Sequence, residues 1–237
     1  MKKYLAIDIG GSKLAIASID EEGKILKIVR EEFGSVYTKI ELMEKIDRML
    51  VKFEIPGHIA CGVAIPGLCD ASTGIWIYSS YSHIENFPIA KQLEAVLQIP
   101  VFIENDVNLS AIGEKTFGYC KNINDFMWIT ISNGIGGALI LGGKPYLGSN
   151  GFSGELGHFV MDESSDALCG CGHRGCLESL ASGTGISNAY LRYTGIFRNA
   201  REIADLARKG EIEAKRVYAE AGMYLGRAFA YAINLLN

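Results

Sequence analysis

Three cysteines and one histidine follow one another closely enough to bind a single metal ion. Cys169, Cys171 and Cys176 form the pattern Cys-x-Cys-x4-Cys, and His158 precedes the first of them by eleven residues. Four such ligands form a structural zinc site and leave no open position for a catalytic water. We therefore predict a structural Zn²⁺ at these four residues. His173 is an alternative fourth ligand, although it lies inside the tight turn with a cysteine on each side.

The alternative to a metal site is one disulfide and one free thiol, which an oxidising compartment would favour. The first residues, MKKYLAIDIGGSKLAIASID, do not read as a signal peptide because Asp8 and two glycines interrupt the apolar run. No apolar stretch reaches the roughly 18 residues of a membrane-spanning helix, so we expect no membrane partner. We expect a cytoplasmic, reducing setting, in which clustered cysteines more often bind metal. The net charge of −4, without a block of like charges, argues against nucleic acid as a partner.

Hydrophobic periodicity and turn residues divide the 237 residues into alternating strands and helices. Short glycine turns join the first three strands, which predicts an antiparallel meander. The order of elements favours an α/β protein of two related lobes, and a change of composition at 118–124 suggests lobes of residues 1–117 and 118–237. The expected strands are 4–9, 14–19, 24–33, 59–65, 101–104, 126–132 and 138–141, and the expected helices are 42–53, 88–98 and 211–237, with another opening at Asn105 and Asp106.

Two glycine-rich turns could each bind a phosphate group. Glycine lets backbone N–H groups approach an anion closely, and Ser12 and Lys13 could add donors in the first turn. Each turn alone could equally be an ordinary hairpin, but two in one chain suggest that both face one phosphate chain. The candidate residues are Asp8, Gly10, Gly11, Ser12 and Lys13 in the first turn, and Asn133, Gly134, Gly136 and Gly137 in the second.

Three carboxylates could act on a small ligand. In IENDVN, Asp106 follows a predicted strand and opens a helix, a position that faces a ligand crevice in α/β proteins. Asp106 could also be a plain helix N-cap. The zinc site would hold the backbone around Glu155 and Glu178, whose carboxylates could then form a rigid polar wall suited to the hydroxyl groups of a ligand. Charge pairs on an exposed surface are the alternative for these two glutamates.

Five stretches together resemble the ROK family (repressor, open reading frame, kinase), which includes bacterial sugar kinases. They are DIGGSK, IENDVN, the GIGG turn, GELGH and CGCGHRGCLES, and they occur in the family's order across essentially the whole chain. The resemblance implies an actin-like ATPase fold, α/β in class, with two lobes and a cleft between them. It also implies transfer of the γ-phosphate of ATP to a hexose hydroxyl with Mg²⁺.

The resemblance assigns a role to each matching residue. Asp106 matches the family's catalytic base, and Asp8 helps to position Mg²⁺. The two glycine turns match loops that bind the phosphates of ATP. The sugar-binding positions are Asn105, Glu155, His158 and Glu178, with Gly67 in a turn that lines the same pocket, and the zinc ligands are His158, Cys169, Cys171 and Cys176.

Three departures from the family pattern leave alternatives open. Asn133 replaces the usual threonine of the second loop, and Tyr78–Phe87 is closer to β-glucoside kinases than to many glucokinases. The sugar could therefore be that of a glucokinase, N-acetylmannosamine kinase, fructokinase or β-glucoside kinase. The sequence ends at Asn237, before the family's adenosine-binding segment, so the second lobe is expected to be incomplete.

Two functions other than catalysis are rivals of the kinase reading, and the first of them is the stronger. A non-catalytic, zinc-containing sugar-binding protein is the alternative to a kinase, because the adenosine-binding segment is missing. A sugar-responsive repressor would carry a winged helix before DIGG, and only seven residues precede Asp8 here. A homodimer is expected from the family.

Overall fold

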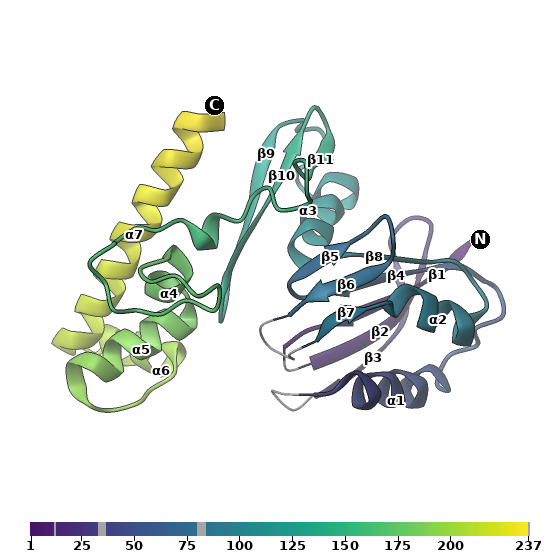
Figure 1. The fold of residues 1–237 in the computed structure, drawn as a ribbon, viewed down its shortest axis with the longest axis horizontal. Helices are drawn as coiled ribbons and strands as arrows, with labels where there is room; N and C mark the ends of the chain where they lie inside the picture. Colours follow the sequence, from purple (N-terminus) through teal and green to yellow (C-terminus); the bar gives the residue numbers. More distant parts are fainter. Residues whose placement is uncertain (12, 33–36, 80–83, 237) are drawn as a thin grey trace. The chain divides into compact units, whose positions relative to one another are not determined.

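The computed structural model describes residues 1–11, 13–32, 37–79 and 84–236. The chain divides into two compact units (Figure 1). Unit 1 comprises Met1–Phe126 and Leu139–Phe152, and unit 2 comprises Met127–Ala138 and Ser153–Asn237. The division crosses the hairpin of β9 (Phe126–Ile131) and β10 (Ile135–Leu141), so each unit is described by itself. The functional lobes expected at 1–117 and 118–237 stay a prediction.

Unit 1 is built on a five-stranded sheet with the strand order β3-β2-β1-β4-β8. The first three strands pair antiparallel, as the short turns predict, whereas β1, β4 and β8 run parallel to one another. The elements of the unit are β1 (Lys3–Ile9), β2 (Lys13–Asp20), β3 (Ile25–Glu32), α1 (Lys39–Leu50), β4 (His58–Ile65), β5 (Leu68–Asp70), β6 (Ile75–Tyr78), β7 (Glu85–Phe87), α2 (Ile89–Leu97), β8 (Val101–Asn105), α3 (Asp106–Phe117) and β11 (Lys144–Tyr146).

The core of unit 1 lies on one face of this sheet. Alternate residues of the parallel strands, among them Ile7, Val63 and Ile103, are buried in one cluster with the apolar faces of α1 and α2. Glu104 follows Ile103 and points to the opposite face. There its carboxylate accepts a hydrogen bond from Asn108 of α3, so α3 covers the second face.

The first turn of α1 carries a capping box that makes part of the stability of unit 1 depend on pH. Hydrogen bonds from the backbone N–H and the hydroxyl of Thr38 lower the pKa of Glu41 below its ordinary value of 4.5. Because the folded pKa is depressed, this stabilisation is present above pH 4.5 and is lost as the pH falls through the folded pKa. We expect Glu41→Ala to be less stable than the wild type in urea unfolding at pH 7, and the difference to shrink at pH 3. A difference that persists unchanged at pH 3 would contradict this reading.

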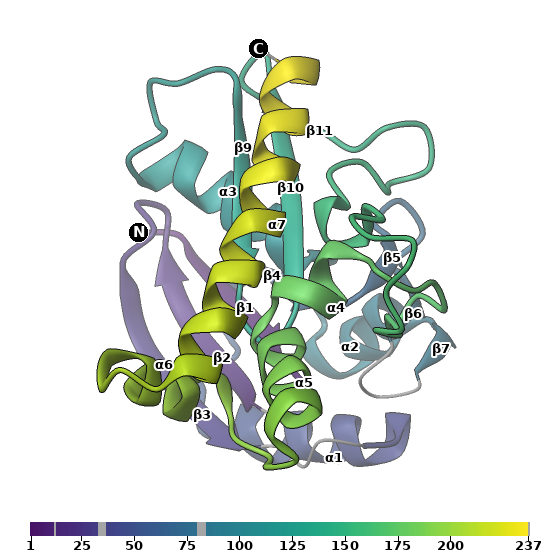
Figure 2. The same cartoon turned by 90° about the vertical axis from the view of Figure 1, so that its left-hand side faces the viewer.

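Unit 2 combines one end of the β9–β10 hairpin with a group of helices (Figure 2). The long helix α7 contacts α4, α5 and α6. Ile135 and Leu156 belong to the same buried cluster as the apolar faces of these helices. The other elements of the unit are a 3₁₀ turn at Leu156–His158, α4 (Leu177–Ala181), α5 (Gly183–Thr194), α6 (Ala200–Arg208) and α7 (Ile212–Leu236).

The expected strands and helices are largely present, with one correction at the second glycine turn. The turn itself is short, since Ser132 N–H donates to Gly134 O at 2.9 Å and β10 already begins at Ile135. Gly136 and Gly137 therefore lie in a strand, and the expectation that they belong to the turn is wrong. The short strands β5, β6, β7 and β11 were not expected. No helix in the described ranges combines the length and apolar character that a bilayer crossing requires.

Candidate active site and metal centre

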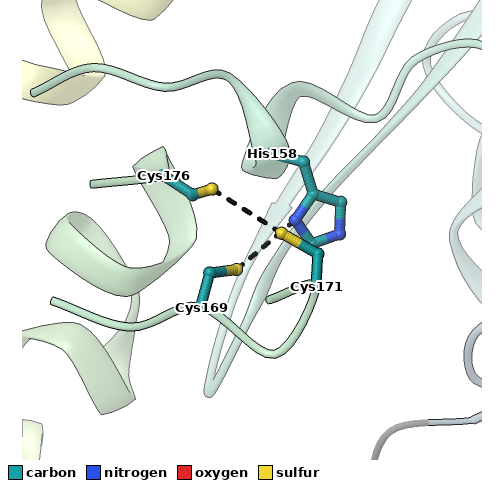
Figure 3. A group of neighbouring side chains, drawn as sticks. All are labelled: His158, Cys169, Cys171 and Cys176. Carbon is teal, nitrogen blue, oxygen red and sulfur yellow. Dashed lines mark hydrogen bonds between the residues drawn. The ribbon is translucent and has the colours of Figure 1, made fainter. Parts of the chain in front are cut away.

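The predicted metal ligands form one cluster in unit 2. One ligand atom from each of His158, Cys169, Cys171 and Cys176 lies within 4.8 Å of all the others. The Sγ atoms of Cys171 and Cys176 are 3.7 Å apart, and Cys169 Sγ lies 3.5 Å from Nδ1 of His158 (Figure 3). The four side chains point toward one common centre (Figure 3).

Two backbone features bring these ligands together. A β-bridge between Val160 and Cys176, with Leu177 N–H donating to Phe159 O at 2.8 Å, places the segment after His158 beside the third cysteine. A second bridge joins Leu168 to Arg174 and closes a tight loop around the first two cysteines. The glycines at 172 and 175 have φ values of +90° and +69°, which only glycine adopts readily. The glycines between the cysteines therefore permit the loop.

The distances between ligand atoms fit a tetrahedral zinc ion. With Zn–S near 2.3 Å and Zn–N near 2.0 Å, ideal tetrahedral geometry puts two sulfurs about 3.8 Å apart and a sulfur about 3.5 Å from a nitrogen. The observed separations are 3.7 Å and 3.5 Å. Burial raises the pKa of the Cys169 thiol to about 12. A bound dication is what deprotonates such a thiol, so the chemistry of the donor set also fits a metal.

His158 rather than His173 belongs to the four-residue group that could hold the metal. Nδ1 of His158 faces the sulfurs, while its Nε2 lies 3.7 Å from Oε2 of Glu155. Metal-bound histidines usually present their second nitrogen to a carboxylate in this way. His173 Nδ1 approaches Cys171 Sγ at 3.7 Å but is not part of the four-residue group.

Glu155 and Glu178 lie next to this cluster. Burial of its carboxyl group raises the pKa of Glu155, the charge of Glu178 adds to the increase, and His158 opposes it. Glu178 is in the first turn of α4, and its Oε2 accepts the backbone N–H of Ile135 at 2.9 Å. Cys169 Sγ lies 3.8 Å from the other oxygen of Glu178. This one carboxylate therefore connects the metal cluster to the start of β10.

The GELGH segment packs directly on the backbone of β10, the strand that follows the second glycine turn. A Cβ atom on Gly157 would lie 2.0 Å from Ile135 O, and one on Gly137 would lie 2.4 Å from Gly154 O. Both contacts are with backbone atoms, which cannot swing away. Gly137 is therefore explained by close packing of two backbone segments, and its role in phosphate binding stays a prediction, as does that of Gly136.

We expect Gly157→Ala to destabilise unit 2 by about 1–3 kcal/mol, because overpacking against a backbone carbonyl forces the chain to shift. Urea unfolding followed by circular dichroism measures the change. Gly222→Ala in α7 is the matched control, since its Cβ would meet no atom within 4 Å. That control should be about 0.5–1 kcal/mol more stable than the wild type, since alanine favours a helix interior. Equal stability of the two variants would refute the packing argument.

In unit 1, three of the predicted stretches meet at one edge of the sheet. The parallel strands β1, β4 and β8 end at Ile9, Ile65 and Asn105, so DIGG, the turn at Gly67 and the Asn105–Asp106 pair follow the same carboxyl ends. Ligands bind at such ends in open α/β sheets. Gly67 has φ +94°, and its carbonyl oxygen accepts a hydrogen bond from Asn105 Nδ2 at 3.0 Å.

The junction between β8 and α3 fixes the backbone of Asp106. Asn105, not Asp106, is the N-cap: its Oδ1 accepts the backbone N–H groups of Val107 and Asn108 at 2.9 and 3.1 Å. The alternative that Asp106 is a plain N-cap is therefore wrong. Asp106 is the first residue of α3, and its Oδ1 also accepts the Val107 N–H, at 3.0 Å. The Asn105 side chain therefore has two structural roles: its oxygen caps α3, and its amide nitrogen donates to the carbonyl oxygen of Gly67.

The first glycine turn follows directly on β1. Gly10 N–H donates to Lys13 O at 2.8 Å, so this amide is used by the turn itself. Burial raises the pKa of the Asp8 carboxyl, and Arg30 opposes the shift. Asp8 is paired with Ala64 in the sheet register, and Ala64 with Glu104, so Asp8 and Glu104 share one row and one face. Gly11 and Lys13 flank Ser12, which lies outside the described residues, as do residues 80–83 of the Tyr78–Phe87 stretch.

The sequence reasoning overlooked Glu104 and Asn108 beside this junction. Oε1 of Glu104 accepts the backbone N–H of Asn105 at 2.9 Å and Nδ2 of Asn108 at 3.0 Å. The available signal was a carboxylate directly before the Asn-Asp pair, with an asparagine one helical turn further on.

Comparison with known proteins agrees with these features. A model of the ROK family matches residues 4–237. The chain is 30% identical to a glucokinase of Thermotoga maritima, over 99% of this chain and 79% of that protein. It is 33% identical to the xylose repressor of Bacillus subtilis, over 98% of this chain but only 61% of the repressor.

A similar solved structure is a ROK family glucokinase from Streptomyces griseus in complex with glucose and AMPPNP. The TM-score is 0.83 with 27% identity, over 99% of this chain and 80% of that one. This similarity confirms the predicted α/β, actin-like ATPase fold. Sequence motifs, fold and family match lead to one conclusion: the chain belongs to the ROK family.

Proposed function

We propose that this protein phosphorylates a hexose or a hexose derivative with ATP. The observation that carries the proposal is the convergence of Asp8, Gly67 and the Asn105–Asp106 pair on the carboxyl ends of three parallel strands. The similar proteins support it, since they include a glucokinase and a glucokinase structure with glucose and AMPPNP. Phosphoryl transfer depends on positioning and charge neutralisation, which such an edge can supply.

Asp106 is the proposed general base. Its carboxylate would accept the proton of the sugar hydroxyl as that oxygen attacks the γ-phosphorus, with ADP as the leaving group. The N-cap bonds of Asn105 hold the backbone on which Asp106 stands, which reduces the entropic cost of reaching the reactive geometry. The hydroxyl becomes acidic as its bond to phosphorus forms, so a carboxylate is a sufficient base.

The proposed sugar-binding residues offer polar groups, several of which already take part in hydrogen bonds or ion pairs within their own unit. Gly67 and Asn105 belong to unit 1, and Glu155, His158 and Glu178 belong to unit 2. Paired carboxylates distinguish hydroxyl-rich ligands because an unmatched buried polar group is costly. Glucose, N-acetylmannosamine, fructose and β-glucosides remain the candidate substrates.

The metal ions have separate proposed roles. Zinc at His158, Cys169, Cys171 and Cys176 would be structural, holding the segment that carries Glu155 and Glu178. Asp8 would help to hold the Mg²⁺ that accompanies ATP, and that ion supplies charge neutralisation at the phosphates. The glycine turns after Asp8 and Ser132 would contact the phosphates through backbone amides.

A sugar-binding protein without catalysis is the second candidate. The xylose repressor of Bacillus subtilis is as similar to this chain as the glucokinase is, and it shows that related chains occur in regulators. The zinc cluster and the carboxylate pair would serve sugar binding equally well. The two functions differ only in whether Asp106 and the phosphate turns act on a nucleotide.

An assay of ADP release across glucose, N-acetylmannosamine, fructose and a β-glucoside separates the two functions. Sugar-dependent ADP release, together with a phosphorylated sugar in mass spectrometry, supports the kinase. Calorimetric sugar binding without turnover in the presence of ATP and Mg²⁺ would establish the binding protein instead.

A further inference from the structure

Glu104 is a half-buried carboxylate that accepts two close hydrogen bonds from the segment around Asp106. Its Oε1 accepts the backbone N–H of Asn105 at 2.9 Å and the side-chain amide of Asn108 at 3.0 Å. These two partners lie immediately before Asp106 and two residues after it. A single oxygen atom therefore holds a backbone amide before the proposed base and a side-chain amide after it.

The position of β8 explains why this bond is needed. β8 lies at the edge of the five-stranded sheet, and among the described strands of this sheet its neighbour is β4. The Glu104 side chain takes up the N–H of Asn105 at this edge, where an unpaired donor would be costly. Asn108 is buried at 9% exposure, and its amide likewise needs an acceptor. The Glu104 carboxylate accepts hydrogen bonds from both donors at the junction between β8 and α3.

The charge of Glu104 has no partner of opposite sign in the described part of the chain. A half-buried carboxylate without a cation costs desolvation energy. Hydrogen bonds to a charged acceptor are about twice as strong as neutral ones. The hydrogen bonds that Glu104 accepts offset part of this desolvation cost. They also order the short segment that carries Asn105 and Asp106.

We propose that Glu104 is a positioning residue that holds Asp106, through Asn105 and Asn108, in its reactive orientation. Glu104 acts through the geometry of these bonds and does not itself touch the reacting atoms. This inference rests on the proposed kinase function for its catalytic consequence. The ordering of residues 105–108 by Glu104 is independent of that function.

The kinetic test compares Glu104→Ala with Glu104→Gln. The alanine variant loses the acceptor, and we expect kcat/KM to fall about 10- to 100-fold, since a small misplacement of a catalytic group has effects of this size. Glutamine keeps an oxygen at the position of Oε1, so we expect it to retain kcat/KM within about fivefold, with an unchanged pH profile. A glutamine variant as impaired as the alanine variant would show that the charge acts directly, and would overturn the proposal. So would an alanine variant with wild-type kinetics.

Glu114→Ala is the matched control for loss of stability. Glu114 is on α3, the helix that begins at Asp106. Its carboxylate also accepts a backbone N–H, that of Tyr119 at 3.1 Å, but at the far end of this helix. We expect this variant to lower the Tm about as much as Glu104→Ala while leaving kcat/KM within about twofold of the wild type. An equal loss of kcat/KM in both variants would show that Glu104 contributes only to stability, and would contradict its positioning role.

Amide hydrogen exchange tests the ordering of the segment without any assay of activity. Glu104→Ala should speed exchange at Asn105, Val107 and Asn108, and Glu104→Gln should not. If the wild type proves inactive toward every sugar, the kinase proposal fails, and this exchange result alone decides the inference about Glu104. Unchanged exchange in Glu104→Ala would refute it.

The Cys69 thiol reports on the charge of Glu104. Its Sγ lies 3.9 Å from Glu104 Oε1, and burial, followed by the charge of Glu104, raises the pKa of Cys69 to about 12. Glu104→Gln removes the charge, so Cys69 should react faster with iodoacetamide at pH 8, as read by peptide mass spectrometry. An unchanged rate would show that Glu104 does not lie beside Cys69 and would count against the proposed arrangement.

Discussion

Asp106→Asn is expected to lower kcat for sugar phosphorylation by about 10²- to 10⁴-fold, the range that a general base contributes. The amide has nearly the same shape as the carboxylate and keeps an oxygen for the Val107 N–H, so the fold should not change. The capacity to accept the hydroxyl proton is lost. We expect the KM for the sugar to stay within about threefold, because the loss concerns the transition state.

Asp47→Asn is the control for this variant. Asp47 is an exposed carboxylate on α1 of the same unit, and it should be replaced without kinetic effect. A value of kcat for Asp106→Asn within about threefold of the wild type would remove Asp106 from the role of base. The proposed mechanism would then fail even if the protein is a kinase.

Cys176→Ser is expected to have the largest effect on the metal centre. Cys176 is fully buried, and its Sγ is one of four atoms around the common centre. Without it, the zinc content should fall from about one ion per chain to well below one half. If free zinc exceeds the wild-type Kd about a thousandfold, the loss of binding removes about 4 kcal/mol of stability. Metal analysis and thermal unfolding of protein purified without chelators measure both effects.

Two further variants show whether this loss is specific. Cys61→Ser also replaces a fully buried cysteine, but Cys61 lies in β4 of unit 1, far in sequence from the cluster, and zinc should be retained. His173→Ala should retain zinc as well, whereas His158→Ala should not. Loss of zinc in His173→Ala with retention in His158→Ala would reverse the choice of the fourth ligand.

The local patterns of the sequence predict the elements that carry strong periodicity. The helical spacing of Leu42, Ile46 and Met49 predicts α1, and these residues are buried as expected. The short strands β5, β6, β7 and β11 escape prediction because three or four residues do not establish a period. Elements of this length depend on pairing with distant parts of the chain.

The second glycine turn shows why tertiary contacts limit such predictions. Three glycines within four residues read as a loop, yet Gly136 and Gly137 belong to β10. Position 137 requires glycine because an added Cβ atom would lie 2.4 Å from the carbonyl oxygen of Gly154, 17 residues away in sequence. A single sequence contains no sign of that contact.

The metal cluster is the part of the candidate site that the sequence predicts best. Ligand type and spacing are local properties, and the four predicted residues point to one centre. The hydrogen bonds that hold the segment around Asp106 are harder to predict from the sequence. Those of Glu104 and Asn105 depend on how the end of β8 meets α3 in three dimensions. Asn105 also shows that a residue predicted from its chemistry can have a structural role as a cap.

A crystal structure with a hexose substrate and a nonhydrolysable ATP analogue tests the central claim most directly. The account predicts that one sugar hydroxyl lies within about 2.6–3.2 Å of a carboxylate oxygen of Asp106 and points toward the γ-phosphate. A sugar bound with every hydroxyl out of reach of Asp106 would contradict the claim that this residue is the base for phosphoryl transfer.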